Sequence, residues 1–421
     1  MAVAAGDKLG REWALLALAT LVASPAPVLR ALDLTNIWNW HVPHVAEAAI
    51  FGLAVFAAAT LLTWASEVAE TEISAGLALV VLALIAVLPE YAVDLYFAVT
   101  AHSTPEHAHL AIANMTGGNR LLVGLAWPVV FFIFWRRLGH RVMPIDRGNA
   151  LGILFLGAAT VYCFSIPIRG HLSLIDTVVM FTLFAAYMYI TSRTPPAEEK
   201  EFLGPARAIG SLGRSGRRAL VLAIFIFAAG VIFAAAEPFA TSLRDSGHSL
   251  GINRFVLVQW VAPLASESPE FILAGLLALR GRHDAGMTIL ISSKVNQWTL
   301  LIGSLPLGYS VAGGTLSPLH FDARQSEEVF LTAGQSLFAV AILVSLSMSR
   351  WEALVLAALF FTQFIFTSTH VRLGYSALYC VLAGLILITD MPKMRSFLGA
   401  AKEGWTGSSH GVGPPTATGP P

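Results

Sequence analysis

Residues 86–99 read AVLPEYAVDLYFAV and residues 265–279 read ASESPEFILAGLLAL, so each stretch places Pro-Glu inside an apolar, helix-length segment. A carboxylate at the centre of a bilayer costs about 2.5–3.5 kcal/mol on insertion scales. An interior proline removes a helical hydrogen bond and costs about 3 kcal/mol more. Two such pairs, Pro89-Glu90 and Pro269-Glu270, therefore indicate an intramembrane functional site.

Composition places the chain among multi-pass membrane proteins. Of its 421 residues, 56% are hydrophobic and 12% are charged, against roughly 25% charged in soluble domains. The net charge is zero, so charge gives no argument for nucleic acid, and the expected partners are the lipid bilayer and inorganic cations. Cys163 and Cys380 lie in apolar runs and are interpreted as core residues. Composition leaves the oligomeric state open.

About twelve segments are long and apolar enough to cross a bilayer, which takes roughly 20 residues. The first is either a span or a signal peptide, because Lys8 and Arg11 precede an apolar stretch that ends in small residues. The predicted spans lie near residues 12–30, 47–65, 74–100, 107–135, 149–166, 173–191, 219–241, 252–279, 284–309, 328–348, 352–369 and 373–390.

The distribution of Lys and Arg predicts the orientation in the cell membrane. With every span counted, most of these residues fall in segments on the same side as the amino terminus, including the long loop from Ser192 to Arg218. Basic residues are retained on the cytoplasmic side. Both termini are therefore expected to be cytoplasmic.

The predicted spans divide into two five-helix repeats with additions at each end. Each Pro-Glu span is followed by a short loop and a returning span, and the loops 101–106 and 280–283 fall on opposite sides of the membrane. Equivalent segments in opposite orientation indicate inverted repeats, each with a discontinuous Pro-Glu helix. The predicted divisions are an extra span and interfacial segment (1–45), the first repeat (46–191), a cytoplasmic linker (192–218), the second repeat (219–369), an extra span (370–403) and a disordered tail (404–421).

The residues around each Pro-Glu pair predict a cation site. Asp94 lies four residues after Glu90, and Glu267 lies three before Glu270, so each pair shares a helical face. Each proline also leaves a backbone carbonyl without its helical donor. Carboxylates and carbonyls suit hard cations such as Ca²⁺ or Na⁺. Four acids with Lys294 and Arg120 leave a charge of minus two, enough for one divalent ion, two monovalent ions or two protons.

The chain resembles the cation/calcium antiporter superfamily, the sodium/calcium exchanger-like membrane proteins. That family carries a G-T-S-x-P-E-like motif in one helix and a G-N-x-x-G-S-N-x-x-N-like motif in the next, in each half. The resemblance covers residues 46–369 and implies a ligand set on the matching positions, which adds Asn114, Asn119, Ser292, Ser293 and Asn296 to Glu90, Asp94, Glu267 and Glu270.

The chain departs from the family pattern at several of these positions. Repeat one lacks the small hydroxyl residues before Pro89, and Glu267 stands where the family usually has Ser. Lys294 lies near a family asparagine, and Arg120 follows Asn119. Each of these two cations is interpreted either as part of the transport site or as a structural ion-pair partner.

The function expected from these features is secondary active cation antiport by alternating access, exchanging calcium or a similar cation for sodium or protons. No resident cofactor is expected, and protons are expected to compete with the cation at the buried acids. The alternative is a monovalent cation/proton exchanger. A membrane-embedded enzyme is disfavoured because the sequence has no H-E-x-x-H motif and no paired Asp-rich motif. A channel is disfavoured by the inverted repeats.

Overall fold

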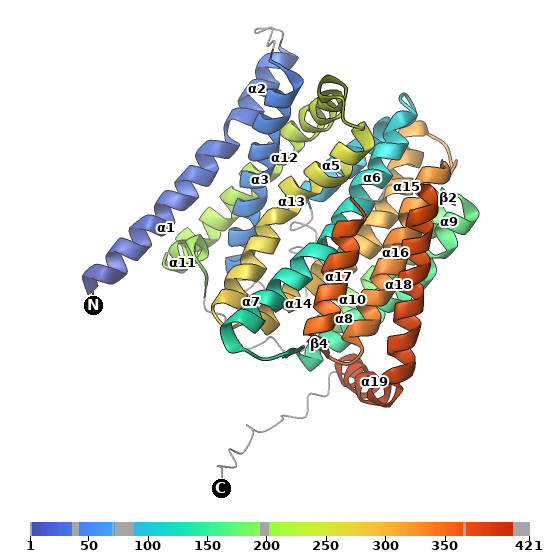
Figure 1. The fold of residues 1–421 in the computed structure, drawn as a ribbon. Coiled ribbons are helices and arrows are strands. Elements are labelled where there is room, and N and C mark those ends of the chain that lie inside the picture. The colour runs from blue at the N-terminus through green and yellow to red at the C-terminus, as the bar shows by residue number, and fades with distance from the viewer. Residues whose placement is uncertain are drawn as a thin grey trace.

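The computed structural model describes residues 2–35, 42–69, 71, 88–193, 202–364 and 368–406. Long helices make up most of this part of the chain, with short strands at their ends (Figure 1). In chain order the elements are α1 (Ala2–Ala23), α2 (Pro25–Leu34), α3 (His44–Ala69), α5 (Leu88–Thr100), α6 (Glu106–Leu121), η1 (Leu122–Ala126), α7 (Trp127–Leu138), β1 (Val142–Pro144), η2 (Arg147–Asn149), α8 (Ala150–Cys163), α9 (Ser165–Arg169), β2 (His171–Leu172), α10 (Leu174–Thr191), α11 (Pro205–Gly210), α12 (Arg214–Leu250), α13 (Arg254–Leu279), α14 (His283–Asn296), η3 (Gln297–Leu301), α15 (Ile302–Gly313), β3 (Leu319–His320), α16 (Ala323–Leu343), β4 (Ser347–Ser349), α17 (Arg350–Thr362), α18 (Thr369–Thr389) and α19 (Met391–Thr406).

Nine helical segments in the described part of the chain are long and apolar enough to span a membrane, and each corresponds to a predicted span. Of the remaining three predicted spans, 74–100 is described only from Leu88, as α5. The span at 284–309 is the helix α14–η3–α15, and that at 352–369 contains the short helix α17. The chain is therefore an all-α membrane protein, as its composition predicts.

The two repeats pack on each other reciprocally. In chain order, α3, α5, α6–α7, α8 and α10 correspond to α12, α13, α14–α15, α16 and α17. Helix α3 packs on α13, and its counterpart α12 packs on α5. In the same way α10 packs on α15 while α17 packs on α7, and α8 packs on α14 while α16 packs on α6. This reciprocity relates the halves by an approximate two-fold axis.

Two small antiparallel sheets show that equivalent helices run in opposite directions. Strand β1, which precedes α8, pairs with β4, which follows α16. Strand β2, which follows α8 and the short helix α9, pairs with β3, which precedes α16. The start of α8 therefore lies at the same end of the molecule as the end of its counterpart α16. The repeats are inverted, as the sequence predicts.

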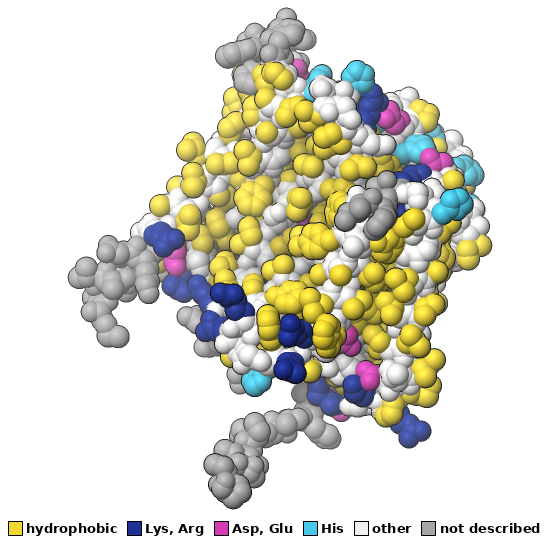
Figure 2. Space-filling view, in the orientation of Figure 1, with side chains coloured by type: hydrophobic (Ala, Val, Ile, Leu, Met, Phe, Trp, Pro, Cys, Tyr) yellow, Lys and Arg dark blue, Asp and Glu magenta, His cyan; other side chains and the backbone are white. Residues whose placement is uncertain are grey.

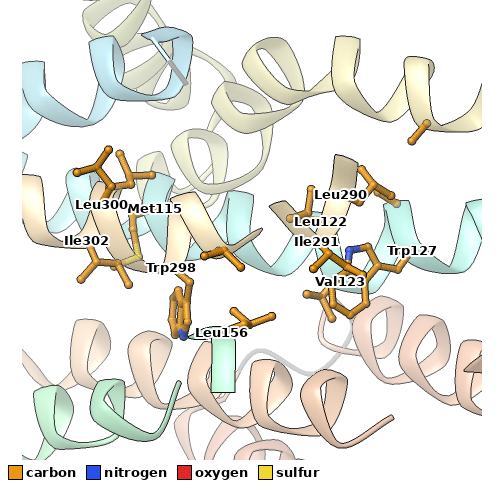
Figure 3. Close-up of a cluster of buried hydrophobic side chains, with 14 of the residues drawn as sticks. Met115, Leu122, Val123, Trp127, Leu156, Leu290, Ile291, Trp298, Leu300 and Ile302 are labelled. Atoms are coloured by element: carbon orange, nitrogen blue, oxygen red, sulfur yellow. The ribbon is translucent and has the colours of Figure 1, made fainter. Parts of the chain in front are cut away.

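Each repeat contains a long returning helix with a π-helical turn in its middle. The first returning helix is α6–η1–α7 and the second is α14–η3–α15. Single π-helical turns inside α-helices are frequent at functional sites. Figure 3 shows part of the apolar core around these helices, formed by Met115, Leu122, Val123 and Trp127 from the first, Leu290, Ile291, Trp298, Leu300 and Ile302 from the second, and Leu156 from α8.

The predicted break in the second Pro-Glu helix is absent. Helix α13 continues from Arg254 to Leu279 through both Pro263 and Pro269. Prolines are tolerated in membrane helices when neighbouring helices and hydroxyl side chains cover the freed backbone groups. Here helix α6 packs directly along α13, and its Gly117 lies against the carbonyl of Gln259, which Pro263 leaves without a helical donor. For the first Pro-Glu helix, residues 72–87 lie outside the described part.

The segments outside the repeats differ in detail from the sequence-based divisions. The linker contains the short helix α11, and α12 begins inside it at Arg214. Helix α19 extends to Thr406, beyond the predicted start of the tail at Gly404, because the Trp405 ring stacks on Phe155 of α8. Residues 407–421, and residues 36–41 of the segment predicted to be interfacial, lie outside the described residues.

Charged side chains gather differently at the two ends of the molecule. Figure 2 shows Lys and Arg concentrated near the end where Figure 1 places β4 and α19, and His concentrated toward the opposite end. The face that Figure 2 shows between these ends is largely apolar. This distribution is what a protein with one basic membrane face presents.

Candidate functional site

The two Pro-Glu helices bring their carboxylates together inside the protein. We call Glu90 and Asp94 of α5 and Glu267 and Glu270 of α13 the acid cluster. The charges of Glu270, Glu267 and Asp94 all act on Glu90, in decreasing order. Glu90 is only 3% exposed, Glu267 2%, and Asp94 is fully buried, whereas Glu270 is half-buried. Four carboxylates this close repel one another unless cations or protons neutralise them.

The first returning helix supports the α5 side of the acid cluster. Asn114 is buried, and its Nδ2 donates a hydrogen bond of 2.9 Å to Oδ1 of Asp94. This bond holds the Asp94 carboxylate against α6, and its second oxygen has no hydrogen-bond partner within the described ranges. The predicted ligands Asp94 and Asn114 therefore do come together.

The second returning helix supports the α13 side. The side chain of Ser293 hydrogen-bonds to Glu270, and that of Gln297, one turn later, hydrogen-bonds to Glu267. The predicted ligand Asn296 is buried on the same helix, one residue before the π-helical turn. Ser292 does not join this group, because its Oγ lies 3.4 Å from the hydroxyl of Tyr187 on α10. Neighbouring residues of a helix point about 100° apart, which separates Ser292 from Ser293.

Two glycines of α6 allow the close approach of α13. A Cβ at Gly117 would lie 1.7 Å from the carbonyl oxygen of Gln259, the oxygen that Pro263 leaves without a helical donor. A Cβ at Gly118 would lie 2.1 Å from Oε1 of Glu267. Any larger residue at either position would push the helices apart. These glycines therefore set the spacing between α6 and the acid cluster.

Lys294 lies at the contact between the two returning helices and is fully buried. Its Nζ donates to Oδ1 of Asn119 at 2.7 Å and to the backbone carbonyl of Asn119 at 3.2 Å. The charge of Glu267 also acts on it. The predicted site residues Asn119 and Lys294 thus bind each other beside the acid cluster.

Arg120 does not belong to the acid cluster, contrary to its place in the sequence-based charge count. Its guanidinium forms an ion pair of 2.6 Å with Glu328 of α16 and lies over the ring of Trp260. Arg120 follows Asn119 directly, so the turn of the helix points it toward α16 instead. Without Arg120, the four ionised acids and Lys294 together carry a charge of minus three.

The oxygens of the site are those that a hard cation prefers. Among the described residues, one carboxylate oxygen of each acid has no hydrogen-bond donor, and the same holds for the amide oxygens of Asn114 and Gln297. Unsatisfied buried oxygens are costly, and binding a cation satisfies them. In the described part of the chain, no three His, Cys, Asp or Glu side chains are positioned to hold one ion together. Amide and hydroxyl oxygens are therefore needed to complete a coordination shell.

Sequence reasoning missed two residues of functional interest. Gln297 directly follows the predicted ligand Asn296 and is three residues after Lys294, so helical spacing alone could have placed it beside the site. Glu328 was not recognised as the partner of Arg120, because the two residues lie in different repeats and no sequence motif links them.

The sodium/calcium exchanger protein family matches residues 45–193 and 220–369 of the chain. The crystal structure of the H⁺/Ca²⁺ exchanger CAX is 42% identical, with a TM-score of 0.86 over 93% of this chain and 98% of that protein. Native YfkE (17% identical, TM-score 0.61, 84% of this chain and 98% of that one) and the sodium-calcium exchanger NCX_Mj (18%, 0.52, 77% and 99%) share the fold. No match was found among curated protein sequences.

The matched segments cover both Pro-Glu helices and both returning helices, which together hold the acid cluster. The sequence motifs, the inverted repeats and the similarity to CAX thus agree. The chain is a cation antiporter that belongs to the sodium/calcium exchanger family.

Proposed function

We propose that this antiporter exchanges Ca²⁺ for protons across the cell membrane. The observation that carries the proposal is the 42% identity to an H⁺/Ca²⁺ exchanger over 93% of the chain. The acid cluster lies within the region of similarity and supplies the carboxylates that both ions need. Oxygen ligands suit Ca²⁺, and the same carboxylates accept protons when Ca²⁺ leaves.

The proposed cycle uses the acid cluster as a shared site. Ca²⁺ binds the ionised carboxylates of Glu90 and Glu270, with Asp94, Asn114 and Ser293 as supporting groups. Protons from the opposite side then neutralise these acids and displace the ion. Because the repeats are inverted, one arrangement of the helices opens the site to one side, and the arrangement in which the two repeats exchange conformations opens it to the other.

A flux assay in proteoliposomes tests this function. Vesicles containing the purified protein and loaded with Ca²⁺ should release it when the external medium supplies protons, and should acidify as they do so. An external Na⁺ gradient at matched pH should drive little release. Release driven only by Na⁺ would replace the proton with sodium as the counter-ion, and release that needs no counter-ion would indicate a channel.

We further propose that the amino and carboxyl termini and the β1–β4 end lie in the cytoplasm. Arg136, Arg137, Arg141, Arg147 and Arg350 surround this end of the chain, which agrees with the retention of basic residues on the cytoplasmic side. The His-rich end would then face outward, with His171 and His320 paired across the β2–β3 sheet.

A further inference from the structure

Lys294 has the surroundings of a bound monovalent cation. Its Nζ is held by two oxygens of one residue, the side-chain Oδ1 and the backbone carbonyl of Asn119. The ring of Trp298 lies on another side, with its centroid 4.4 Å from Nζ. Carbonyl-type oxygens and an aromatic face are the groups that bind ammonium and alkali cations.

Among the residues that the structure describes, none forms an ion pair with the Lys294 ammonium. In the described part of the chain, Nζ of Lys294 forms hydrogen bonds only with Asn119 and is absent from the salt bridges, in contrast to Arg120, Arg169 and Arg372. A buried cation normally requires a carboxylate partner. Here the nearby acid cluster supplies negative potential without a direct bond, and Glu267 remains available to a transported ion.

Lys294 and Asn119 occupy equivalent positions in the two repeats. Each lies three residues before the π-helical turn of its returning helix. The first turn begins at Leu122, three residues after Asn119, and the second begins at Gln297, three residues after Lys294. Equivalent residues that touch must lie on the approximate two-fold axis. One repeat supplies the amide and the other supplies the cation, so the contact between the two returning helices carries a fixed positive charge.

We propose that Lys294 is a tethered monovalent cation, filling a position that Asn119 and Trp298 build for an alkali or ammonium ion between the repeats. The four-carbon stem of the side chain delivers the charge, so the protein needs no free monovalent ion there. Shortening residue 294 to alanine leaves the oxygens of Asn119 and the ring of Trp298 in place. That variant should bind a free cation in the vacated space.

Cation-dependent stabilisation of the purified protein tests the proposal independently of transport. Lys294→Ala should unfold at a lower temperature than wild type in choline chloride, and KCl or ethylammonium chloride at equal ionic strength should raise its Tm in a saturable manner. Lys294→Met fills the space with a neutral side chain and should not respond. Lys402→Ala, which alters an exposed lysine of α19, should behave as wild type.

A second measurement addresses transport and rests on the proposed Ca²⁺/H⁺ exchange. Lys294→Ala should lose roughly tenfold or more in Ca²⁺ flux, as expected for a buried charged hydrogen bond, and K⁺ or ethylammonium should restore part of it. If Lys294→Ala gains no more Tm from K⁺ or ethylammonium than Lys294→Met does, the tethered-cation proposal is wrong. If K⁺ or ethylammonium stabilises Lys294→Ala but the wild type shows no Ca²⁺/H⁺ flux, the proposed function is wrong and the tethered-cation proposal stands. If Lys294→Ala cannot be purified, failure of both salts to rescue its yield in membranes also counts against the proposal.

Discussion

Gly118 of the first returning helix contacts the carboxylate of Glu267 so closely that a methyl group on Gly118 would lie 2.1 Å from Oε1 of Glu267. The two residues belong to different repeats, so this contact joins the halves at the acid cluster. It also leaves no space for rotation of the Glu267 side chain toward α6. The geometry of the site therefore depends on a residue that itself binds no ion.

Gly118→Ala should impair exchange, because the added methyl group displaces the Glu267 carboxylate or separates α6 from α13. Overpacking of a tight contact costs about 1–3 kcal/mol, so the variant should still insert and fold. Ca²⁺ affinity and flux measured in proteoliposomes check this prediction. Gly230→Ala in α12, where an added Cβ meets nothing within 4 Å, is the matched control. Equal flux in both variants would contradict the assigned role of Gly118.

Neutralising either central acid should abolish exchange. Glu90→Gln and Glu270→Gln keep the size of the side chain but remove the charge that offsets dehydration of the ion. Both variants should retain wild-type or higher thermal stability, because each removes repulsion within the acid cluster. Glu237→Gln, in α12 and outside the acid cluster, is the control. Normal flux in both variants would remove these residues from the site.

Glu328 should matter for stability more than Arg120 does. Arg120 and Arg324 pair with Glu328 at 2.6 and 2.9 Å, and Arg372 of α18 also contacts it. Breaking a buried ion pair costs about 3–5 kcal/mol, and Glu328→Gln removes the carboxylate that three arginines share, leaving Arg372 its second ion pair with Glu327. Arg120→Met leaves the Glu328 carboxylate with two arginine partners, Arg324 and Arg372. Thermal unfolding should therefore rank Glu328→Gln as the less stable variant, and the opposite ranking would contradict this account.

Cysteine labelling should place the two small sheets on opposite sides of the membrane. With Cys163 and Cys380 replaced by alanine, Leu316→Cys near β3 and Val142→Cys in β1 introduce thiols at sites 84% and 51% exposed. A membrane-impermeant maleimide should label Leu316→Cys in intact cells and Val142→Cys only after permeabilisation. Labelling of both in intact cells would exclude the proposed topology.

Acidification should weaken Ca²⁺ binding, because each proton taken up by the acid cluster removes a charge that attracts the ion. Loss of the Lys294 charge makes protonation of Glu267 easier, so Lys294→Met should show the same inhibition at a higher pH. Lys402→Met should leave the profile unchanged. Ca²⁺ affinity measured from about pH 5 to 9 provides the check. A flat profile in the wild type would mean that protons do not compete at this site.

The sequence determined the features that depend on local composition and periodicity. Apolar segments of spanning length identified the membrane class, and the repeated Pro-Glu pairs with loops on opposite sides identified two inverted halves. The grouping of Glu90 with Asp94 and of Glu267 with Glu270 follows from helical spacing within one segment. These inferences need only the geometry of a single helix and the thickness of a bilayer.

Only the tertiary structure decided which residues of different helices meet. Helical spacing gives the direction of a side chain from its own axis but not the neighbour on that side, so Arg120 was grouped with the acids when it binds Glu328. The sequence placed Lys294 only near a family asparagine, whereas the π-helical turns make it the counterpart and binding partner of Asn119. An extra residue in a helical turn shifts the register by about 100°. Such a shift is set by packing between helices, and the order of residues along one helix does not reveal it.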